Sequence, residues 1–369
     1  MTITRKEIED GMILFCKSGS HAYGLNTESS DLDYKGICIA PKRFYITFQE
    51  FQQKDKGWDQ EDYPESPFPQ LNGSDSVVYE IRRYLQLLFS QNPNILEMLW
   101  QEPDDYIHLT ESARILINNR HRLISRRIAG TFIQYARAQI KKMETHRKWL
   151  LNPPTKAPEW SDYDMSVPAL TKTQTGAFLE YLYLLIKDRM EYYYPAKELY
   201  DILNEKVDWK GVLKQHVLPE DCVEMTQEMT RATPEYMVLL RKSQEYHSDL
   251  KRWNSYQDWL KNRNPQRSEI ERQCGYDGKN ASHCVRLMKM AIEALKTGEL
   301  IVNRNLAGDR ELLMSIKTGR LSYVEVNQMV NDLFTESEHV LHNQCVLPRT
   351  IDYDFVNELC EQIVSVTLG

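Results

Sequence analysis

The sequence lacks the features that mark several large classes of protein. Its seven cysteines include no C-x-x-C pair and no Cys/His metal-binding spacing, which argues against a zinc motif or a disulfide framework and indicates reduced thiols. No stretch reaches the roughly 18 uninterrupted apolar residues of a membrane span. The apolar run 12–16 is too short for the core of a signal peptide. We therefore expect a cytoplasmic protein with no membrane partner.

An excess of positive charge and several catalytic motifs are also missing. The 46 Lys and Arg residues are outnumbered by 53 Asp and Glu residues, for a net charge of -7. This balance disfavours a protein whose main task is to grip duplex nucleic acid. The sequence contains no G-x-S-x-G, H-E-x-x-H or G-x-x-x-x-G-K-[ST] motif, which argues against the hydrolase, metalloprotease and P-loop chemistries that these motifs support.

The remaining composition is that of an ordinary globular protein. Hydrophobic residues make up 41% and charged residues 27% of 369 positions, enough for two domains or for one domain with a large insert. Strand-like runs at 12–16 and 31–40 come first. Residues 52–75 are rich in Gly, Pro, Asp and Asn, as in a long excursion between elements.

Helical patterns dominate the rest of the chain. Apolar residues at Val77, Ile81 and Leu88 have helical spacing, and this helix is expected to stop at Asn92-Pro93. A strong amphipathic pattern ends at Gly298, a predicted C-cap. The fold class is therefore α+β, with a small mixed-sheet head and a large helical body. We place the head at residues 1–110 and the body at 111–369, with 150–275 as an insert-like region.

One short stretch, GSHAYGLNTESSDLD at residues 19–33, suggests a chemistry. Side chains two apart on a strand share a face, so Asp31 and Asp33 would project together and could bridge two Mg²⁺ or Mn²⁺ ions. Gly19 lets the backbone approach a phosphate closely, and the Ser20 hydroxyl can donate to it. A short helix between the two strands would bring Asp31 back beside Gly19.

Each half of this motif is a weak signal alone, and the two together are a specific one. A lone D-x-D is commonly a solvated turn, and Gly-Ser occurs in any loop. The order strand, Gly-Ser, about ten residues, D-x-D and strand is far more specific. It predicts a site for two metal ions and a nucleoside triphosphate. Tyr23, inside the motif, is expected to pack under the loop.

A second candidate group lies on the helix that ends at Gly298. Lys279, His283 and Arg286 are spaced i, i+4 and i+7, so they share one face. This cationic stripe could point into the cleft between head and body and neutralise the charge of a triphosphate. The alternative is a solvated face with one satisfied histidine.

These segments resemble the DNA-polymerase-β-like nucleotidyltransferase superfamily. The stretch GSHAYGLNTESSDLDYKGI is similar to the branch found beside RNA ligases, the RlaP type, which also occurs in phages. Three later segments also look like that branch: NPNILEMLW, GYDGKNASHCVRLMKMAIEALKTGEL and VLPRTIDYDFVNEL.

The resemblance implies roles for individual residues. Gly19 and Ser20 would bind the β- and γ-phosphates, and Asp31 and Asp33 would ligate the two metals. The superfamily has a third carboxylate on a neighbouring strand, for which Asp75 is our choice and Glu80 the alternative.

The implied reaction is the metal-dependent transfer of a nucleoside monophosphate from an NTP to a hydroxyl, with release of pyrophosphate. The family's association with RNA ligases makes RNA, as a tRNA or an RNA end, the expected acceptor. Two rivals remain open at this point. The acceptor could be a protein or a small molecule, or the chain could be a nucleotide-binding module without turnover.

Overall fold

The computed structural model describes residues 2–368 except 29, 56, 60–61, 73–74, 193–222 and 264. The chain forms two compact units. Unit 1 combines residues 1–151 with residues 266–369, and unit 2 consists of residues 152–265. The candidate site residues named above all fall in unit 1.

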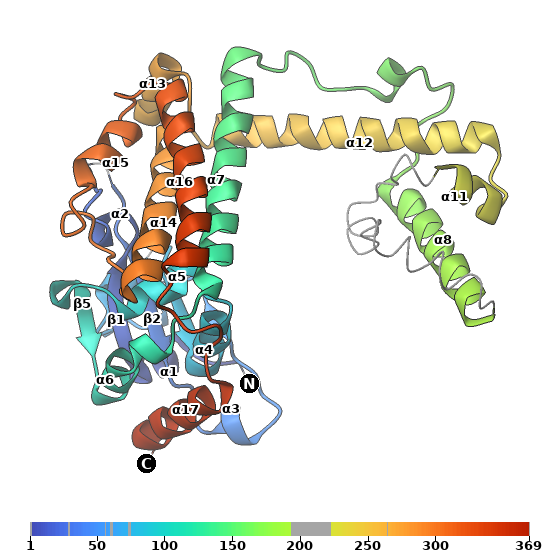
Figure 1. The fold of residues 1–369 in the computed structure, drawn as a ribbon. Coiled ribbons are helices and arrows are strands. Elements are labelled where there is room, and N and C mark those ends of the chain that lie inside the picture. Colours follow the sequence, from blue (N-terminus) through green and yellow to red (C-terminus); the bar gives the residue numbers. More distant parts are fainter. Residues whose placement is uncertain are drawn as a thin grey trace. The chain divides into compact units, whose positions relative to one another are not determined.

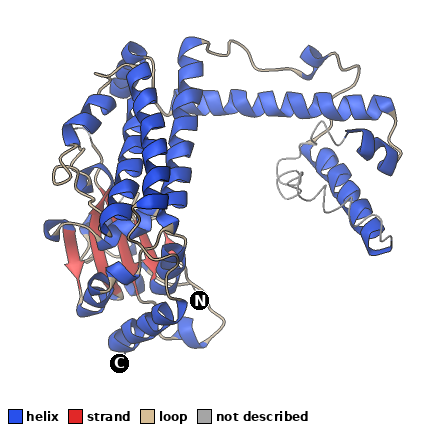
Figure 2. Cartoon of the chain, viewed as in Figure 1, coloured by secondary structure: helices blue, strands red, loops and turns tan. Residues whose placement is uncertain are grey.

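A five-stranded mixed sheet forms one side of unit 1 (Figures 1 and 2). Its strands in chain order are β1 (Met12–Ser18), β2 (Asp33–Cys38), β3 (Gln53–Lys54), β4 (Val77–Glu80) and β5 (Tyr106–Leu109). The spatial order is β3-β4-β2-β1-β5, in which only the β2–β4 pair is parallel. The α+β class predicted from the sequence is confirmed.

The helix predicted from Val77 onward begins later than its spacing suggested. Residues Val77–Glu80 are a strand, and α4 (Ile81–Phe89) begins only after it. Two adjacent valines favour extended backbone, and Val78 is fully buried where β4 pairs with β2. Pairing within the sheet therefore overrides the helical spacing at this position.

Helices form the larger part of unit 1. Before the insert they are α1 (Arg5–Asp10), α2 (Gly19–Ala22), α3 (Arg43–Ile46), α4, α5 (Pro93–Leu96), α6 (Glu111–Asn118) and α7 (Arg127–Leu151), with 3-10 turns at Pro69–Leu71, Glu97–Leu99, Pro103–Asp105 and Arg120–Arg122. After it come α13 (Pro265–Cys274), α14 (Gly278–Thr297), α15 (Arg310–Lys317), α16 (Tyr323–Asn343) and α17 (Tyr353–Leu368). Figure 1 shows α7, α14 and α16 side by side.

The ends of α14 follow the sequence signals. The Asp277 carboxylate accepts a hydrogen bond from the Asn280 N–H at 3.0 Å and caps the first turn. Gly298, at φ +79°, caps the other end as predicted. Between them α14 contributes much of the buried core of unit 1.

One continuous core joins the sheet to the helices on both sides of the insert. It includes Leu14 and Ile37 from the strands, Phe132 from α7 and Met288 from α14, all at most 1% exposed. The core does not divide at residue 110, where the sequence placed the head-body boundary. The division by contacts falls at residues 151 and 266.

Unit 2 has a small core of its own. Its described elements are the 3-10 turn Trp160–Tyr163, α8 (Lys172–Tyr192), α11 (Val223–Thr230) and α12 (Pro234–Lys261). Its buried apolar residues are Leu179, Leu182, Met237 and Leu240. The Tyr163 hydroxyl donates to Asp249 at 2.8 Å, which fixes the turn against α12.

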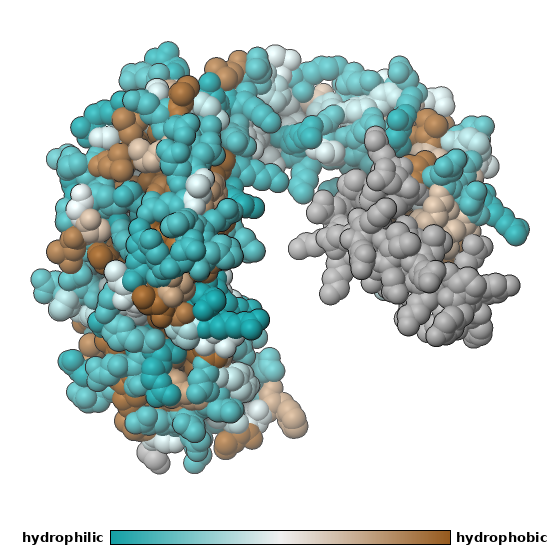
Figure 3. Space-filling model, in the orientation of Figure 1, coloured by the Kyte–Doolittle hydropathy of each residue, from teal (hydrophilic) through white to brown (hydrophobic). Residues whose placement is uncertain are grey.

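The surface is mainly hydrophilic. On the face drawn in Figure 3, apolar residues lie in small patches between hydrophilic ones. Within the described residues, every helix is too short or too polar to cross a membrane.

Two phenylalanines provide a test of the core. Phe132 is 0% exposed, whereas Phe48 is fully exposed. We expect Phe132→Ala to lower the free energy of unfolding by about 3–5 kcal/mol, because it leaves a cavity. Phe48→Ala, the matched control, is expected to change it by about 0.5 kcal/mol or less. Urea denaturation measures both, and equal effects would contradict the packing of α7 described here.

Candidate active site

The start of α2 and the start of β2 meet at one point. β1 runs directly into Gly19, which adopts φ +64°, and β2 returns antiparallel with Asp33 opposite Ser18. The Asp33 Oδ2 lies 2.5 Å from the position that a Cβ on Gly19 would occupy. Only glycine leaves room for this carboxylate and favours this backbone conformation. The Gly-Ser turn and the second aspartate of D-x-D are thus in direct contact.

Asp75 joins them from the next strand. β2 and β4 are parallel, with Lys35 opposite Val77. Continuing this register by two residues places Asp75 beside Asp33. Neighbouring residues of a parallel pair point to the same face, and Asp75, two residues before β4, is exposed and lies outside any helix. The structure therefore brings Asp75 to the D-x-D pair.

Glu80, the alternative third carboxylate, lies elsewhere. It pairs with Cys38 at the other end of β4 and is only 1% exposed. Its carboxylate caps α4 by accepting the Arg82 N–H at 2.9 Å and also accepts the Tyr45 hydroxyl at 2.7 Å. The structure corrects that alternative, because the chain commits Glu80 to a helix start at a distance of several residues along the sheet.

The charges around Asp33 show how closely the acidic residues converge. Burial raises the pKa of Asp33, and the negative charges of Asp31 and Asp75 raise it further, while Lys279 and Lys35 oppose the shift. Among the described residues, no three His, Cys, Asp or Glu side chains already stand in metal-binding geometry. Asp31 and Asp75, both exposed, thus each repel the partly buried Asp33.

The charge of Lys279 acts on Asp33, and Lys279 also acts on His283, one turn further along α14. Burial lowers the pKa of His283 to about 3, and the cations Arg286, Lys142 and Lys279 lower it further. A neutral imidazole therefore lies among cations. Lys317 is a further cation near Lys279. Burial and the charge of Lys279 lower its pKa.

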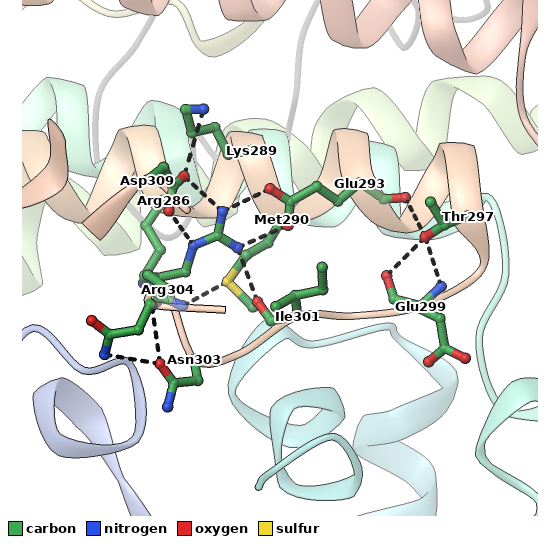
Figure 4. A network of polar contacts seen from close by, with 11 residues as sticks. Arg286, Lys289, Met290, Glu293, Thr297, Glu299, Ile301, Asn303, Arg304 and Asp309 are labelled. Atoms are coloured by element: carbon green, nitrogen blue, oxygen red, sulfur yellow. Dashed lines mark hydrogen bonds and ion pairs between the residues drawn. The ribbon is translucent and has the colours of Figure 1, made fainter. Parts of the chain in front are cut away.

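Arg286 does not take the position expected of it. It is 1% exposed, and its Nη1 donates to the Glu97 Oε1 at 2.7 Å and contacts the Met290 sulfur at 3.0 Å (Figure 4). Its guanidinium lies 3.5 Å from the centre of the Tyr23 ring, and the Tyr23 hydroxyl donates to Glu97 at 2.6 Å. The expectation that Arg286 lies open to a nucleotide is corrected, because burial in a helical core pairs it with Glu97. Tyr23 does pack under the loop.

Three cations at the site were not identified from the sequence. Lys35 lies two residues after Asp33 on the same face of β2, and its Nζ donates to the Asn94 carbonyl at 3.0 Å. Burial lowers its pKa. The alternation D-x-D-x-K could have revealed Lys35. Lys142 and Lys317 arrive from α7 and α15, and no local pattern marks them.

The Ser20 hydroxyl has no hydrogen-bond partner among the described residues, although Ser20 is partly buried. Its backbone carbonyl is engaged, since it accepts the Leu25 N–H at 2.8 Å. The turn is therefore fixed through its main chain while its hydroxyl stays available. This arrangement suits a side chain that donates to an anionic oxygen.

His283 gives a pH dependence that can be measured. The unfolded chain binds a proton near the usual pKa of 6.5, whereas the folded protein does so only near pH 3. Stability should therefore fall as the pH drops from about 6.5 toward 3, by up to about 1.4 kcal/mol per pH unit from this group. In nucleotide-free protein, urea denaturation at pH 7 and pH 4.5 should show a smaller loss for His283→Gln. The matched control His342→Gln changes an exposed histidine and should keep the wild-type loss. An unchanged loss in His283→Gln would refute the assignment.

The comparisons with known proteins agree with this geometry. Residues 2–156 match the family model RlaP, described as the RNA repair pathway DNA polymerase beta family. No curated protein and no solved structure gives a match. The matched segment contains β1, α2, β2 and β4, and with them Gly19 and all three aspartates. Similarity to a polymerase-β-like family indicates nucleotidyltransferase activity. Over residues 2–156 the chain is therefore similar to the RlaP family of DNA-polymerase-β-like proteins.

Proposed function

We propose that the protein transfers a nucleoside monophosphate from an NTP to a hydroxyl acceptor and releases pyrophosphate, with two Mg²⁺ or Mn²⁺ ions. One observation carries this proposal. The Asp33 carboxylate packs against Gly19 of the Gly-Ser turn, where the negative charges of Asp31 and Asp75 and the positive charges of Lys279 and Lys35 act on it.

The donor set suits hard divalent cations. Asp31, Asp33 and Asp75 offer only carboxylate oxygens, the ligands that Mg²⁺ prefers. When bound, the ions neutralise the developing charge on the phosphates and favour ionisation of the attacking hydroxyl. Burial and the neighbouring Asp31 and Asp75 raise the pKa of Asp33, and a bound cation would favour its ionised form.

The chain's own residues have separate tasks in this proposal. Asp31, Asp33 and Asp75 would hold the ions. The Gly19 main chain and the Ser20 hydroxyl bind the leaving pyrophosphate.

Lys279 adds positive charge beside that pyrophosphate. His283 stays neutral, since its pKa is about 3, so it acts as a hydrogen-bonding group rather than a charge. In this proposal the carboxylates come from the sheet side of the site, and the positive charges come from Lys35 of β2 and Lys279 of α14.

We propose an RNA end as the acceptor. Support comes from the description of the matched family as an RNA repair pathway family. All six cysteines that lie in the described part of the chain are unpaired thiols, which supports a reducing, cytoplasmic setting for the reaction. Incubation with labelled ATP and either tRNA or RNA oligonucleotides tests the acceptor. Label on RNA supports the proposal, and label only on a protein band or a small molecule would replace RNA with that acceptor.

A second candidate function is nucleotide binding without turnover. It is favoured by the lack of a ready three-carboxylate arrangement among the described residues. All four NTPs, each with Mg²⁺ or Mn²⁺, should be tested for pyrophosphate release. NTP binding without any pyrophosphate would establish the binding module instead.

Asp33→Asn separates catalysis from folding. Pyrophosphate release should fall by about three orders of magnitude, because metal-ion stabilisation of the transition state amounts to several kcal/mol. The melting temperature should stay the same or rise, since the pKa of Asp33 is raised in the folded state and a neutral amide removes the repulsion. The exposed Asp104→Asn is the matched control. Near-normal turnover in Asp33→Asn would disprove the metal site.

A further inference from the structure

Residues 23–25 follow the Gly-Ser turn, and we call them the exit loop. Their three backbone carbonyls all accept hydrogen bonds from one distant segment, residues 304–317. The Tyr23 carbonyl accepts the backbone N–H of Arg304 at 3.0 Å. The Gly24 carbonyl accepts the Arg310 Nε at 2.8 Å, and the Leu25 carbonyl accepts the Lys317 Nζ at 2.5 Å. All three donors lie beyond the family match at residues 2–156.

The exit loop is bonded directly to the turn that the proposed function assigns to phosphate. The Tyr23 N–H donates to the Gly19 carbonyl at 3.2 Å, and the Leu25 N–H donates to the Ser20 carbonyl at 2.8 Å. A displacement of the exit loop therefore displaces Gly19 and Ser20. The position of the turn depends on whatever holds the loop.

The holding segment is itself firmly anchored. Arg304 is 0% exposed and spends all five N–H donors on protein acceptors, in a network around α14 (Figure 4). Two bonds reach Glu293 at 2.7 and 2.8 Å, two reach Asp309 at 2.7 and 2.9 Å, and one reaches the Ile301 carbonyl at 2.9 Å. Bidentate pairs of this kind fix orientation as well as distance. These bonds therefore fix the conformation of the loop from Arg304 to Arg310.

Close packing reinforces these bonds. Gly24 has φ +66°, and a Cβ there would collide with the Asn305 side-chain amide and come within 3.2 Å of the Asn303 Oδ1. On its other side, the Tyr23 ring lies against Arg286. The exit loop is thus packed between Asn303 and Asn305 on one side and Arg286 of α14 on the other.

The same segment also sets the position of Lys279. The preceding residue, Gly278, has so little space that a Cβ would lie 2.8 Å from the Ile316 carbonyl oxygen and 2.7 Å from that of Lys317. The last turn of α15 therefore supports the start of α14 with its main chain, while the Lys317 side chain supports the exit loop.

We propose that Arg310 and Lys317 are positioning residues, which hold the exit loop so that the Gly-Ser turn stands at a fixed distance from Asp33 and Lys279. The inference rests on the proposed function, because it assumes that the turn binds the phosphates of an NTP. It adds that the nucleotide site is completed by the segment from Arg304 to Lys317.

Methionine substitutions in the full-length protein test this role. Arg310→Met and Lys317→Met each remove one charged donor to the exit loop, while Arg310→Lys and Lys317→Arg retain a donor. Arg320→Met is the control, because Arg320 is exposed and its Nε bonds only to Thr318. Amide hydrogen exchange over residues 18–26 is measured without nucleotide, and ATP affinity is measured by equilibrium dialysis with Mg²⁺.

The expected result is a joint local effect. In both methionine variants, exchange over residues 18–26 should accelerate by about tenfold and ATP binding should weaken by about tenfold, the effect of losing a hydrogen bond to a charged group. Exchange in α6 should not change. The conservative variants should recover most of the affinity, and Arg320→Met should match wild type.

The outcomes distinguish this inference from the proposed function. Variants that bind ATP as tightly as wild type would overturn the positioning role, whatever their exchange rates. So would weaker binding with wild-type exchange over residues 18–26. If wild type itself bound no ATP, the proposed function would fail, and the inference with it.

Discussion

The structure of the site depends on one contact, between the Asp33 carboxylate and the bare Cα of Gly19. It exists because β1 and β2 are antiparallel and place Ser18 opposite Asp33, so that the turn after β1 closes onto the start of β2. The 2.5 Å between Oδ2 and the position of a Cβ leaves no space for a side chain. A phosphate bound at the turn would therefore lie beside the carboxylate, and under the proposed function a cation would offset the repulsion between the two negative groups.

The same contact explains the distribution of charge around it. The ionised form of Asp33 is disfavoured by burial and then by repulsion from Asp31 and Asp75, which together raise its pKa. Lys35, from the same strand face, and Lys279, from α14, compensate part of this repulsion. A cation that binds only the folded state would compensate the rest and would stabilise the protein by linkage. Under the proposed function, the charge that Asp33 needs for binding a cation is the one that its burial disfavours.

The sequence predicted which secondary-structure elements carry the site residues. It did not predict the contacts between residues that are far apart in the chain. The D-x-D alternation correctly placed Asp33 on a strand, and the resemblance led to Asp75, although helical spacing wrongly extended the following helix back to Val77. The i, i+4 and i+7 pattern of α14 gave the right face. It could not say that Arg286, further along, meets Glu97 in the core, because periodicity identifies a face but not what covers it. Arg310 and Lys317 lie nearly 300 residues from the carbonyls they bind, and no local signal records such a contact.

The position of the insert follows from the same core. α7 and α14 pack side by side within unit 1, yet residues 152–265 separate them in the chain. Two contacts pin the base of the insert: His146 to Asp277 at 2.7 Å, and the Arg147 Nη1 to the Gly275 carbonyl at 2.6 Å. Because these contacts hold the ends together, the length of the chain between them adds only slowly to the entropy of closure. Unit 2 can therefore be large without loosening α14, whose first turn carries Lys279 to the candidate active site.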